Sequence, residues 1–368
     1  MGTLRLLLAL SVLFAHGGAF PITDGTLAGG RPAVQSFYII SGFYMALILT
    51  EGYRNLADFY FNRFLRLFPT YWGVLAISMI GAAAAGRPTF VTEVLFAHND
   101  VLGWDSKLLM LCANLVIFGS NAMMFLFPSA DGLAFTADFQ AHGYRTLWSL
   151  HQIPQAWTLP IEMMFYAIAP FLVKSWRRLL LVAGASIALR LAIYSYVSAG
   201  DPWTYRFFPT ELAFFCAGSL AFHAYRLLSG RPWTREAGLI AFVTVIIYVL
   251  NFERVPGLLP DTPLIEGRLL QFYLAILASL PFVFEFSRSS RADRWIGELS
   301  YPVYLVHYAV ILAVSAVQPA HGAIYYVLAI SLLLSVAINA LIYDPIETHF
   351  KRRARRDRDL QSVVAAQT

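Results

Sequence analysis

The first apolar segment of the chain contains two ionisable side chains, Arg5 and His16. Eleven residues at about 100° per residue return to within roughly 20° of the same helix face, with a rise of about 16 Å. One helix would therefore place a cation near one membrane boundary and an imidazole well above it. Because an imidazole can remove a proton from a hydroxyl near neutral pH, His16 is a candidate general base. Alternatively, Arg5 reaches lipid headgroups and His16 only bonds a neighbouring helix.

A pair of arginines, Arg63 and Arg66, lies three residues apart on one helical face. Pro69 follows, where we expect the third apolar span to begin. Two guanidiniums at a membrane interface suit a ligand that bears phosphate, because arginine binds phosphate through parallel hydrogen bonds. Anchoring by positively charged loop residues would explain the same pair.

A carboxylate, Glu162, lies about one turn inside another apolar segment, and Tyr166 follows four residues later on the same face. A carboxylate at that depth needs a partner, and His16 would lie at a comparable depth. We therefore expect Glu162 to orient or tune His16. The alternative is that Glu162 faces water at the interface.

Small and polar residues mark two further helices. Ser41 and Gly42 form a small-residue site that allows close helix approach. Ser300, Tyr304 and His307 are spaced at i, i+4 and i+7, which predicts one polar stripe toward the interior of a bundle. Packing alone would explain either feature.

The remaining ionisable residues give weaker signals. Arg190, Glu211 and Arg268 lie in or beside apolar segments, where we favour internal ion pairs over contacts with an acidic or sugar acceptor. His142 and His151 lack the spacing of a metal site. The sequence contains no P-loop, dinucleotide-binding glycine motif or G-x-S-x-G elbow.

The composition limits the class of protein that could position these side chains. The 368 residues are 58% hydrophobic and only 13% charged, about half the charge of an average soluble domain. This excludes disorder and a coiled coil and makes a polytopic membrane protein the expected class. The net charge of +5 comes from arginines between apolar spans, so no nucleic-acid surface is indicated. Cys112 and Cys216 lie in apolar runs and indicate neither disulfides nor a metal cluster.

The apolar segments predict where the chain crosses the membrane. Their bounds are 4–20, 33–50, 68–85, 108–127, 157–173, 179–197, 207–227, 237–250, 269–286, 296–317 and 323–343. The basic clusters can all be cytoplasmic only if 108–127 does not cross fully. We therefore predict an all-α bundle of about ten transmembrane helices with both termini cytoplasmic, and a re-entrant or interfacial stretch in an outer loop, 90–156. The first segment is also shaped like a signal peptide, although a histidine late in its apolar run argues against cleavage. Residues 1–350 would form one membrane domain and 351–368 a basic cytoplasmic tail.

Taken together, these elements resemble the acyltransferase-3 family of membrane-bound O-acyltransferases, which modify bacterial surface polysaccharides and some secondary metabolites. The resemblance covers nearly the whole chain in six ordered motifs. They are Arg5-x10-His16; Gly30 through Ser41, Gly42 and Phe43; Arg63-x-x-Arg66-Leu-x-Pro69-x-Tyr71; Trp157-Thr-Leu with Glu162, Phe165 and Tyr166; Leu299 through Tyr301, Tyr304 and His307; and Tyr343 through Glu347. Gln35 stands where many members carry Asp, and His349 stands where a proline is frequent. These two departures bear on the subfamily, and so on the identity of the acceptor, more than on the type of reaction.

The resemblance implies a role for each site residue. His16 would be the general base on an acceptor hydroxyl, and Glu162 would orient or tune it or position the acceptor. Arg63 and Arg66 would bind the phosphates of acyl-CoA, and Arg5 would line the donor path. Supporting positions would be Ser41, Tyr71, Trp157, Tyr166, Tyr304, His307 and Glu347.

The resemblance also implies the partners and the location. The donor would be acyl-CoA, with acetyl-CoA expected, and no metal would be needed. The acceptor would be a hydroxyl of a cell-surface polysaccharide, an exopolysaccharide or a lipid-linked precursor, at a bacterial cytoplasmic (inner) membrane. The resemblance does not decide whether the chain forms a homodimer. It also does not decide whether the acyl group is transferred directly or through a covalent acyl-histidine.

The main alternative is a secondary transporter or flippase of a sugar-containing or anionic substrate. It requires broken helices in repeat-related positions, and the sequence contains no such repeat. A membrane scaffold would leave the buried His16 and Glu162 unexplained.

Overall fold

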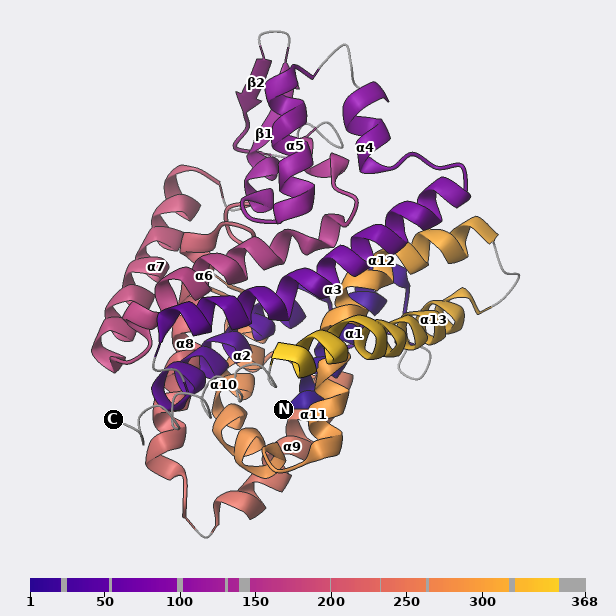
Figure 1. Ribbon diagram of the computed structural model, residues 1–368. Helices are drawn as coiled ribbons and strands as arrows, with labels where there is room; N and C mark the ends of the chain where they lie inside the picture. Colours follow the sequence, from indigo (N-terminus) through magenta and orange to yellow (C-terminus); the bar gives the residue numbers. More distant parts are fainter. Residues whose placement is uncertain are drawn as a thin grey trace, which may run out of the picture.

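The computed structural model describes residues 1–20, 25–52, 55–97, 102–129, 132–138, 146–198, 200–231, 233–262, 265–317 and 322–350. His142 and the expected tail, 351–368, lie outside the described residues. Helices dominate the fold (Figure 1). The α-helices are α1 (Gly2–Gly17), α2 (Gly30–Glu51), α3 (Leu56–Ala84), α4 (Phe90–Thr92), α5 (Trp104–Val116), α6 (Thr158–Leu172), α7 (Trp176–Tyr196), α8 (Phe208–Leu228), α9 (Thr234–Leu250), α10 (Gly267–Ser287), α11 (Arg291–Glu298), α12 (Ser300–Val317) and α13 (Ala323–Ile338). Shorter helical turns are η1 (Glu93–Ala97), η2 (Ser120–Phe125), η4 (Leu147–Leu150), η5 (Pro154–Trp157) and η6 (Asn339–Tyr343), and the strands are β1 (Leu126–Ser129) and β2 (Gly132–Phe135).

Six helical segments of the described chain are long and apolar enough to cross a membrane: Gly30–Glu51, Leu56–Ala84, Trp176–Tyr196, Gly267–Ser287, Arg291–Val317 and Ala323–Phe350. The other expected crossings fall on shorter or more polar helices. α1, α6 and α9 have 16, 15 and 17 residues, at or below the roughly 17–25 that span a bilayer. α8 has 21 residues but carries Glu211 and Arg226. Several apolar helices of this kind make the chain a multi-pass membrane protein.

The third span differs from the prediction at its start. We expected it to begin near Pro69, but α3 starts at Leu56 and contains Pro69 in its interior. The Asn55 side chain accepts a 2.9 Å hydrogen bond from the backbone N–H of Ala57 and so caps the helix. A proline removes one backbone hydrogen bond, and helices packed among others in a membrane tolerate that loss. The arginine motif therefore lies on a continuous helix.

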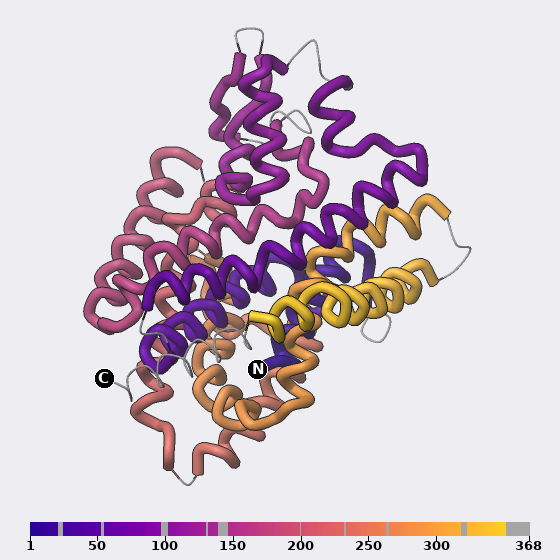
Figure 2. The backbone as a smooth tube through the Cα atoms, in the orientation of Figure 1, coloured from indigo at the N-terminus to yellow at the C-terminus, as the bar shows by residue number. Residues whose placement is uncertain are grey.

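The segment between α3 and α6 projects from the bundle, as the tube in Figure 2 shows. α5 has 13 residues, about 20 Å of helix, which is too short for a hydrocarbon core of about 30 Å. A small core of its own includes Val94, Met110 and Leu147. The sequence did not predict the antiparallel hairpin β1–β2, in which Leu126 pairs with Phe135. The expected apolar segment 108–127 covers only the first two residues of β1, and the rest of the hairpin lies in the expected outer loop, 90–156.

Close packing between α2 and α8 fixes the orientation of α2. A Cβ atom on Gly42 would lie 2.0 Å from the backbone oxygen of Phe215. A Cβ atom on Gly218 would lie 1.8 Å from the backbone oxygen of Ile39. The two glycines let the backbones meet, as Ser41 and Gly42 predicted, and α2 then presents Ser41 to the bundle interior.

Candidate active site

In the described part of the chain, a partly open cavity of about 480 Å³ lies between α1, α2, α3, α6 and α10 to α12. It falls within the range of small-molecule sites, about 300–1,000 Å³. Predicted site residues make up much of its polar lining: Arg5, Ser41, Arg63, Arg66, Glu162, Tyr166 and Tyr304. The apolar part includes Phe37, Ile40 and Met45 of α2. Each of the six motifs contributes at least one lining residue, so the cavity is a cationic and apolar chamber built by all six.

Three arginines from α1 and α3 meet at this cavity. The guanidinium of Arg66 lies 4.9 Å from the centre of the Tyr343 ring, and that of Arg63 lies 5.8 Å from the Tyr166 ring. The Nε atom of Arg63 is buried and has no hydrogen-bond partner among the described residues. Arg288 and Arg294 also line the cavity. Clustered guanidiniums of this kind are suited to a ligand with several negative charges.

Glu162 faces the cavity from α6 and is held by two hydroxyl groups. Ser41 donates a 2.8 Å hydrogen bond to its carboxylate, and Tyr166 donates another. We expected Glu162 to partner His16, and that expectation is wrong for the described structure. Glu162 faces α2, whereas His16, at the end of α1, faces α12. The sequence predicted a similar depth for the two side chains, but it did not predict the directions in which they point.

His16 instead pairs with His307. Its Nδ1 atom lies 3.1 Å from the Nε2 atom of His307, and the two rings are stacked with their centres 5.2 Å apart. His16 is exposed at the end of α1, while His307 is fully buried in α12. Neither lines the cavity, but the Nδ1 atom of His307 lies 2.7 Å from the backbone oxygen of Tyr304, which does. The histidine pair therefore adjoins the cavity through Tyr304.

Tyr304 connects the histidine helix to α6. Its hydroxyl donates a 2.5 Å hydrogen bond to the backbone oxygen of Gln155 and lies 2.9 Å from the Thr158 hydroxyl. Because the phenolic proton is directed to the carbonyl, the Thr158 hydroxyl is the donor in the second contact. The predicted polar stripe on α12 thus points into the bundle.

The three other predicted positions lie outside the cavity lining. Tyr71 donates a 2.6 Å hydrogen bond to the backbone oxygen of Asn114 and ties α3 to α5. The Trp157 ring lies 4.4 Å from the guanidinium of Arg206. Glu347 accepts a 3.2 Å hydrogen bond from Tyr343, whose ring contacts Arg66. These residues brace neighbouring elements.

The sequence reasoning missed several lining residues, among them Tyr38 of α2 and Asp293 of α11. A usable signal was present, because Val34, Tyr38, Ser41 and Met45 all line the cavity at helical spacing. Asp293 accepts hydrogen bonds from the backbone N–H groups that start α1. It carried no motif signal because its partners lie far away in the sequence.

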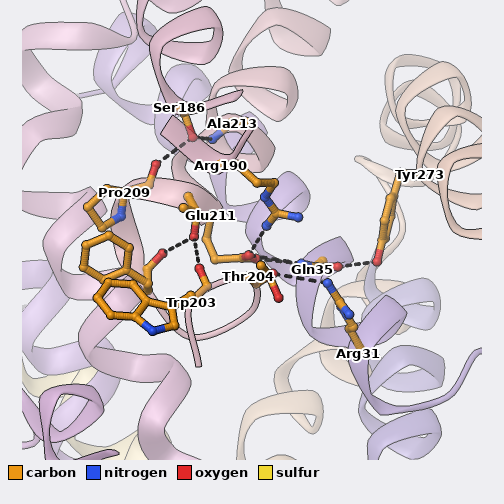
Figure 3. A network of polar contacts seen from close by, with 12 residues as sticks. Arg31, Gln35, Ser186, Arg190, Trp203, Thr204, Pro209, Glu211, Ala213 and Tyr273 are labelled. Carbon is orange, nitrogen blue, oxygen red and sulfur yellow. Dashed lines mark hydrogen bonds and ion pairs between the residues drawn. The ribbon is translucent and has the colours of Figure 1, made fainter. Parts of the chain in front are cut away.

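A second polar cluster lies apart from the cavity, between α2, α7, α8 and α10. Glu211 forms an ion pair with Arg190, and its carboxylate accepts a 2.8 Å hydrogen bond from Gln35 (Figure 3). Gln35 in turn accepts a hydrogen bond from Tyr273. The expected internal ion pair is confirmed for Arg190 and Glu211, whereas Arg268 is exposed on α10.

The sequence of this chain is similar to those of several known proteins. The chain is 24% identical over 380 residues to YrhL of Bacillus subtilis (strain 168), whose name marks it as a candidate peptidoglycan O-acetyltransferase; the match covers 96% of this chain and 55% of YrhL. Exopolysaccharide production protein ExoZ of Rhizobium meliloti (strain 1021) is 26% identical over 44% of this chain and 41% of its own length. Nodulation protein 10 of Rhizobium leguminosarum bv. viciae is 25% identical over 53% of this chain and 49% of its own.

The chain spans about half the length of these relatives. No solved structure matches it. The acyltransferase domain that defines one family of membrane proteins matches residues 2–344, which include the first five motifs, the start of the sixth and every lining residue of the cavity. The chain therefore belongs to the acyltransferase-3 family.

Proposed function

We propose that this chain is an O-acyltransferase that moves an acyl group, acetyl in the first instance, from acyl-CoA to a carbohydrate hydroxyl. The observation that carries the proposal is one cavity that joins a cluster of arginines to Tyr304 of α12, the helix whose His307 pairs with His16 of α1. The arginines match the phosphates of a coenzyme A ester. The apolar lining suits the acyl chain and its arm.

In the proposed reaction the acceptor hydroxyl attacks the thioester carbonyl, and His16 accepts the hydroxyl proton. A carbon–oxygen bond forms, the carbon–sulfur bond breaks, and coenzyme A leaves as a thiolate that takes up the proton. Arg63, Arg66 and Arg5 hold the donor through its phosphates. Glu162 is held by hydrogen bonds from Ser41 and Tyr166 and positions donor and acceptor groups at the cavity. Its negative charge also balances the positive charge of Arg5 through an electrostatic interaction.

We also propose how the chain is oriented in the membrane and which class of molecule accepts the acyl group. We propose about ten crossings in a bacterial inner membrane, one membrane domain over 1–350 and a cytoplasmic basic tail, with the arginines on the donor side and His16 outward. A polysaccharide or lipid-linked sugar as acceptor is supported by the names of YrhL and ExoZ.

The test is transfer of label from radiolabelled acetyl-CoA into envelope glycans. Membranes carrying the wild-type chain are compared with membranes carrying His16→Ala at matched expression, and His349→Ala serves as the exposed histidine control. Label with the wild type and the control, but not with His16→Ala, supports the proposal. Equal label in all three removes His16 from the chemistry, and no label above empty membranes with acetyl-CoA or longer acyl-CoA contradicts acyl transfer.

A further inference from the structure

We infer that His307 is a positioning residue that fixes which ring nitrogen of His16 carries a proton. The hydrogen bonds assign one tautomer to each ring and leave the lone pair of the His16 ring on its Nε2 atom. The assignment follows from geometry alone, and its catalytic consequence rests on the proposed function.

The assignment begins at the buried end of the pair. The Nδ1 atom of His307 lies 2.7 Å from the backbone oxygen of Tyr304. A carbonyl oxygen only accepts, so the Nδ1 atom must carry a proton. His307 is fully buried, and a charged imidazole there would be costly without a carboxylate partner. The ring is therefore neutral, and its Nε2 atom carries a lone pair.

The lone pair determines the state of His16. The Nε2 atom of His307 lies 3.1 Å from the Nδ1 atom of His16. Two lone pairs repel, so the Nδ1 atom of His16 must supply the proton of this hydrogen bond. A neutral His16 then has its lone pair on Nε2. Because His16 is exposed while His307 is not, the free lone pair lies at the accessible end of the chain of hydrogen bonds.

This arrangement suits a general base during a proton transfer. When His16 accepts a proton on Nε2, its Nδ1 proton stays where it is, and the bond to His307 strengthens because the donor is now charged. The orienting group is neutral, unlike the carboxylate of a serine-protease triad, where the wrong tautomer lowers kcat by about 10⁴. An imidazole without such a partner exchanges between its two tautomers, and its ring can rotate.

A series of hydrogen bonds through Tyr304 and His307 holds the proposed general base, His16. The Tyr304 carbonyl that orients His307 belongs to a residue whose hydroxyl is bound to Gln155, 2.5 Å away, at the start of the α6 region. The same residue lines the cavity. The orientation of His16 is thus set by the wall of the proposed donor site.

Three substitutions at one position separate orientation from packing. In His307→Gln, the side-chain oxygen can take the place of Nε2 and accept from His16. In His307→Asn, the shorter amide reaches the Tyr304 carbonyl but not His16, and His307→Leu does neither. Val310→Ala, another buried position of α12, serves as the packing control. Each variant is first checked for the wild-type elution volume and melting temperature in detergent.

The kinetic result expected is a split between kcat and KM. We expect kcat for acetyl transfer to fall at least about tenfold in His307→Asn and His307→Leu, and to return to within a few-fold of wild type in His307→Gln. The KM for acetyl-CoA should stay unchanged, because the arginines are untouched. Wild-type kcat in folded His307→Leu, or a loss that His307→Gln shares fully, would overturn the inference.

A spectroscopic readout does not depend on activity. In protein labelled with ¹⁵N at histidine, the signals absent from His16→Gln identify His16. We expect protonated Nδ1 and unprotonated Nε2 in the wild type and in His307→Gln, and exchange between tautomers in His307→Leu. A protonated Nε2 in the wild type overturns the inference whatever the kinetics. If the tautomer is as expected but no acyl transfer occurs, the proposed function fails while the assignment stands.

Discussion

Ser41 donates a 2.8 Å hydrogen bond to Glu162, although the two residues are 121 positions apart in the sequence. The bond joins α2 to α6 at the cavity wall and holds the Glu162 carboxylate at the cavity. Glu162 and His16 therefore serve the proposed reaction from separate positions, each with its own hydrogen-bond partner.

Removing the charge of Glu162 should reduce activity more than removing the Ser41 hydroxyl. We expect Ser41→Ala to lower kcat/KM up to about tenfold and Glu162→Gln to lower it by about ten- to a hundredfold. The difference arises because Glu162→Gln removes the negative charge itself, whereas Ser41→Ala leaves the carboxylate charged and still bound by Tyr166. Steady-state kinetics with acetyl-CoA check this, with Ser279→Ala of α10 as the control. Wild-type kcat/KM in Glu162→Gln would exclude a role for its charge.

The arginines should govern donor affinity. We expect Arg63→Gln and Arg66→Gln each to raise the KM for acyl-CoA about ten- to a hundredfold, because each removes a charge-assisted contact worth about 1.5–3 kcal/mol. Arg177→Gln, an exposed arginine of α7, should leave KM unchanged. Inhibition by free coenzyme A gives a second measure of the same affinity. A fall in kcat at constant KM and constant inhibition would argue against donor binding at Arg63 and Arg66.

Adding one methyl group at the α2–α8 contact should destabilise the fold. Gly42→Ala places a Cβ atom 2.0 Å from the backbone oxygen of Phe215, so the helices must separate, at a cost of about 1–3 kcal/mol. Gly184→Ala in α7 is the matched control, because nothing lies within 4 Å of its added Cβ atom. Thermal unfolding in detergent should show a lower midpoint for Gly42→Ala only. Equal midpoints for both variants would mean that the two helices do not pack this closely.

The buried ion pair should be strongly non-additive. Arg190→Met leaves the buried Glu211 without its cation, which we expect to cost about 3–5 kcal/mol. Glu211→Leu in addition should recover much of that loss, since a well-packed apolar pair often replaces a buried ion pair without penalty. A double-mutant cycle on unfolding midpoints tests this. Additive losses would show that the two side chains do not form a pair.

His151 should make stability depend on pH. Burial lowers the pKa of His151 from 6.5 to about 4, and its Nε2 atom has no hydrogen-bond partner among the described residues. Between those two pH values the unfolded chain binds more protons than the folded one, so stability falls as pH falls from 6.5 toward 4. At about 1.4 kcal/mol per pKa unit the loss is on the order of 3 kcal/mol. His151→Gln should flatten melting temperature in that window, and an unchanged slope would rule out this group as the cause.

The sequence predicted several spans closely, because apolar runs bounded by polar residues mark helix ends. Segments 33–50, 179–197 and 269–286 correspond to Gly30–Glu51, Trp176–Tyr196 and Gly267–Ser287. The start of α3 was missed because Asp58, Asn62, Arg63 and Arg66 interrupt the apolar residues before Pro69. The hairpin β1–β2 was missed because four-residue strands next to an apolar helix give no distinct period.

The sequence singled out many of the polar residues that line the cavity, although not the partner of His16, and the catalytic roles of these residues stay predictions. Arg5, Ser41, Arg63, Arg66 and Glu162 all line one cavity, because ionisable and small polar residues are retained inside apolar helices where they have a use. The partner of His16 was wrong, because a sequence specifies depth along each helix but not how separate helices are rotated against each other. His307 had been placed on the correct polar stripe.

The most direct test of the central claim is the release of coenzyme A from acetyl-CoA by purified protein, with and without envelope glycan as the acceptor. Wild type, His16→Gln and the exposed-histidine control His349→Gln are compared. We predict that glycan stimulates release in the wild type and in His349→Gln, and that His16→Gln loses at least about a hundredfold of the stimulated rate, as expected for a general base. Glycan-stimulated release by folded His16→Gln at the wild-type rate would contradict the account.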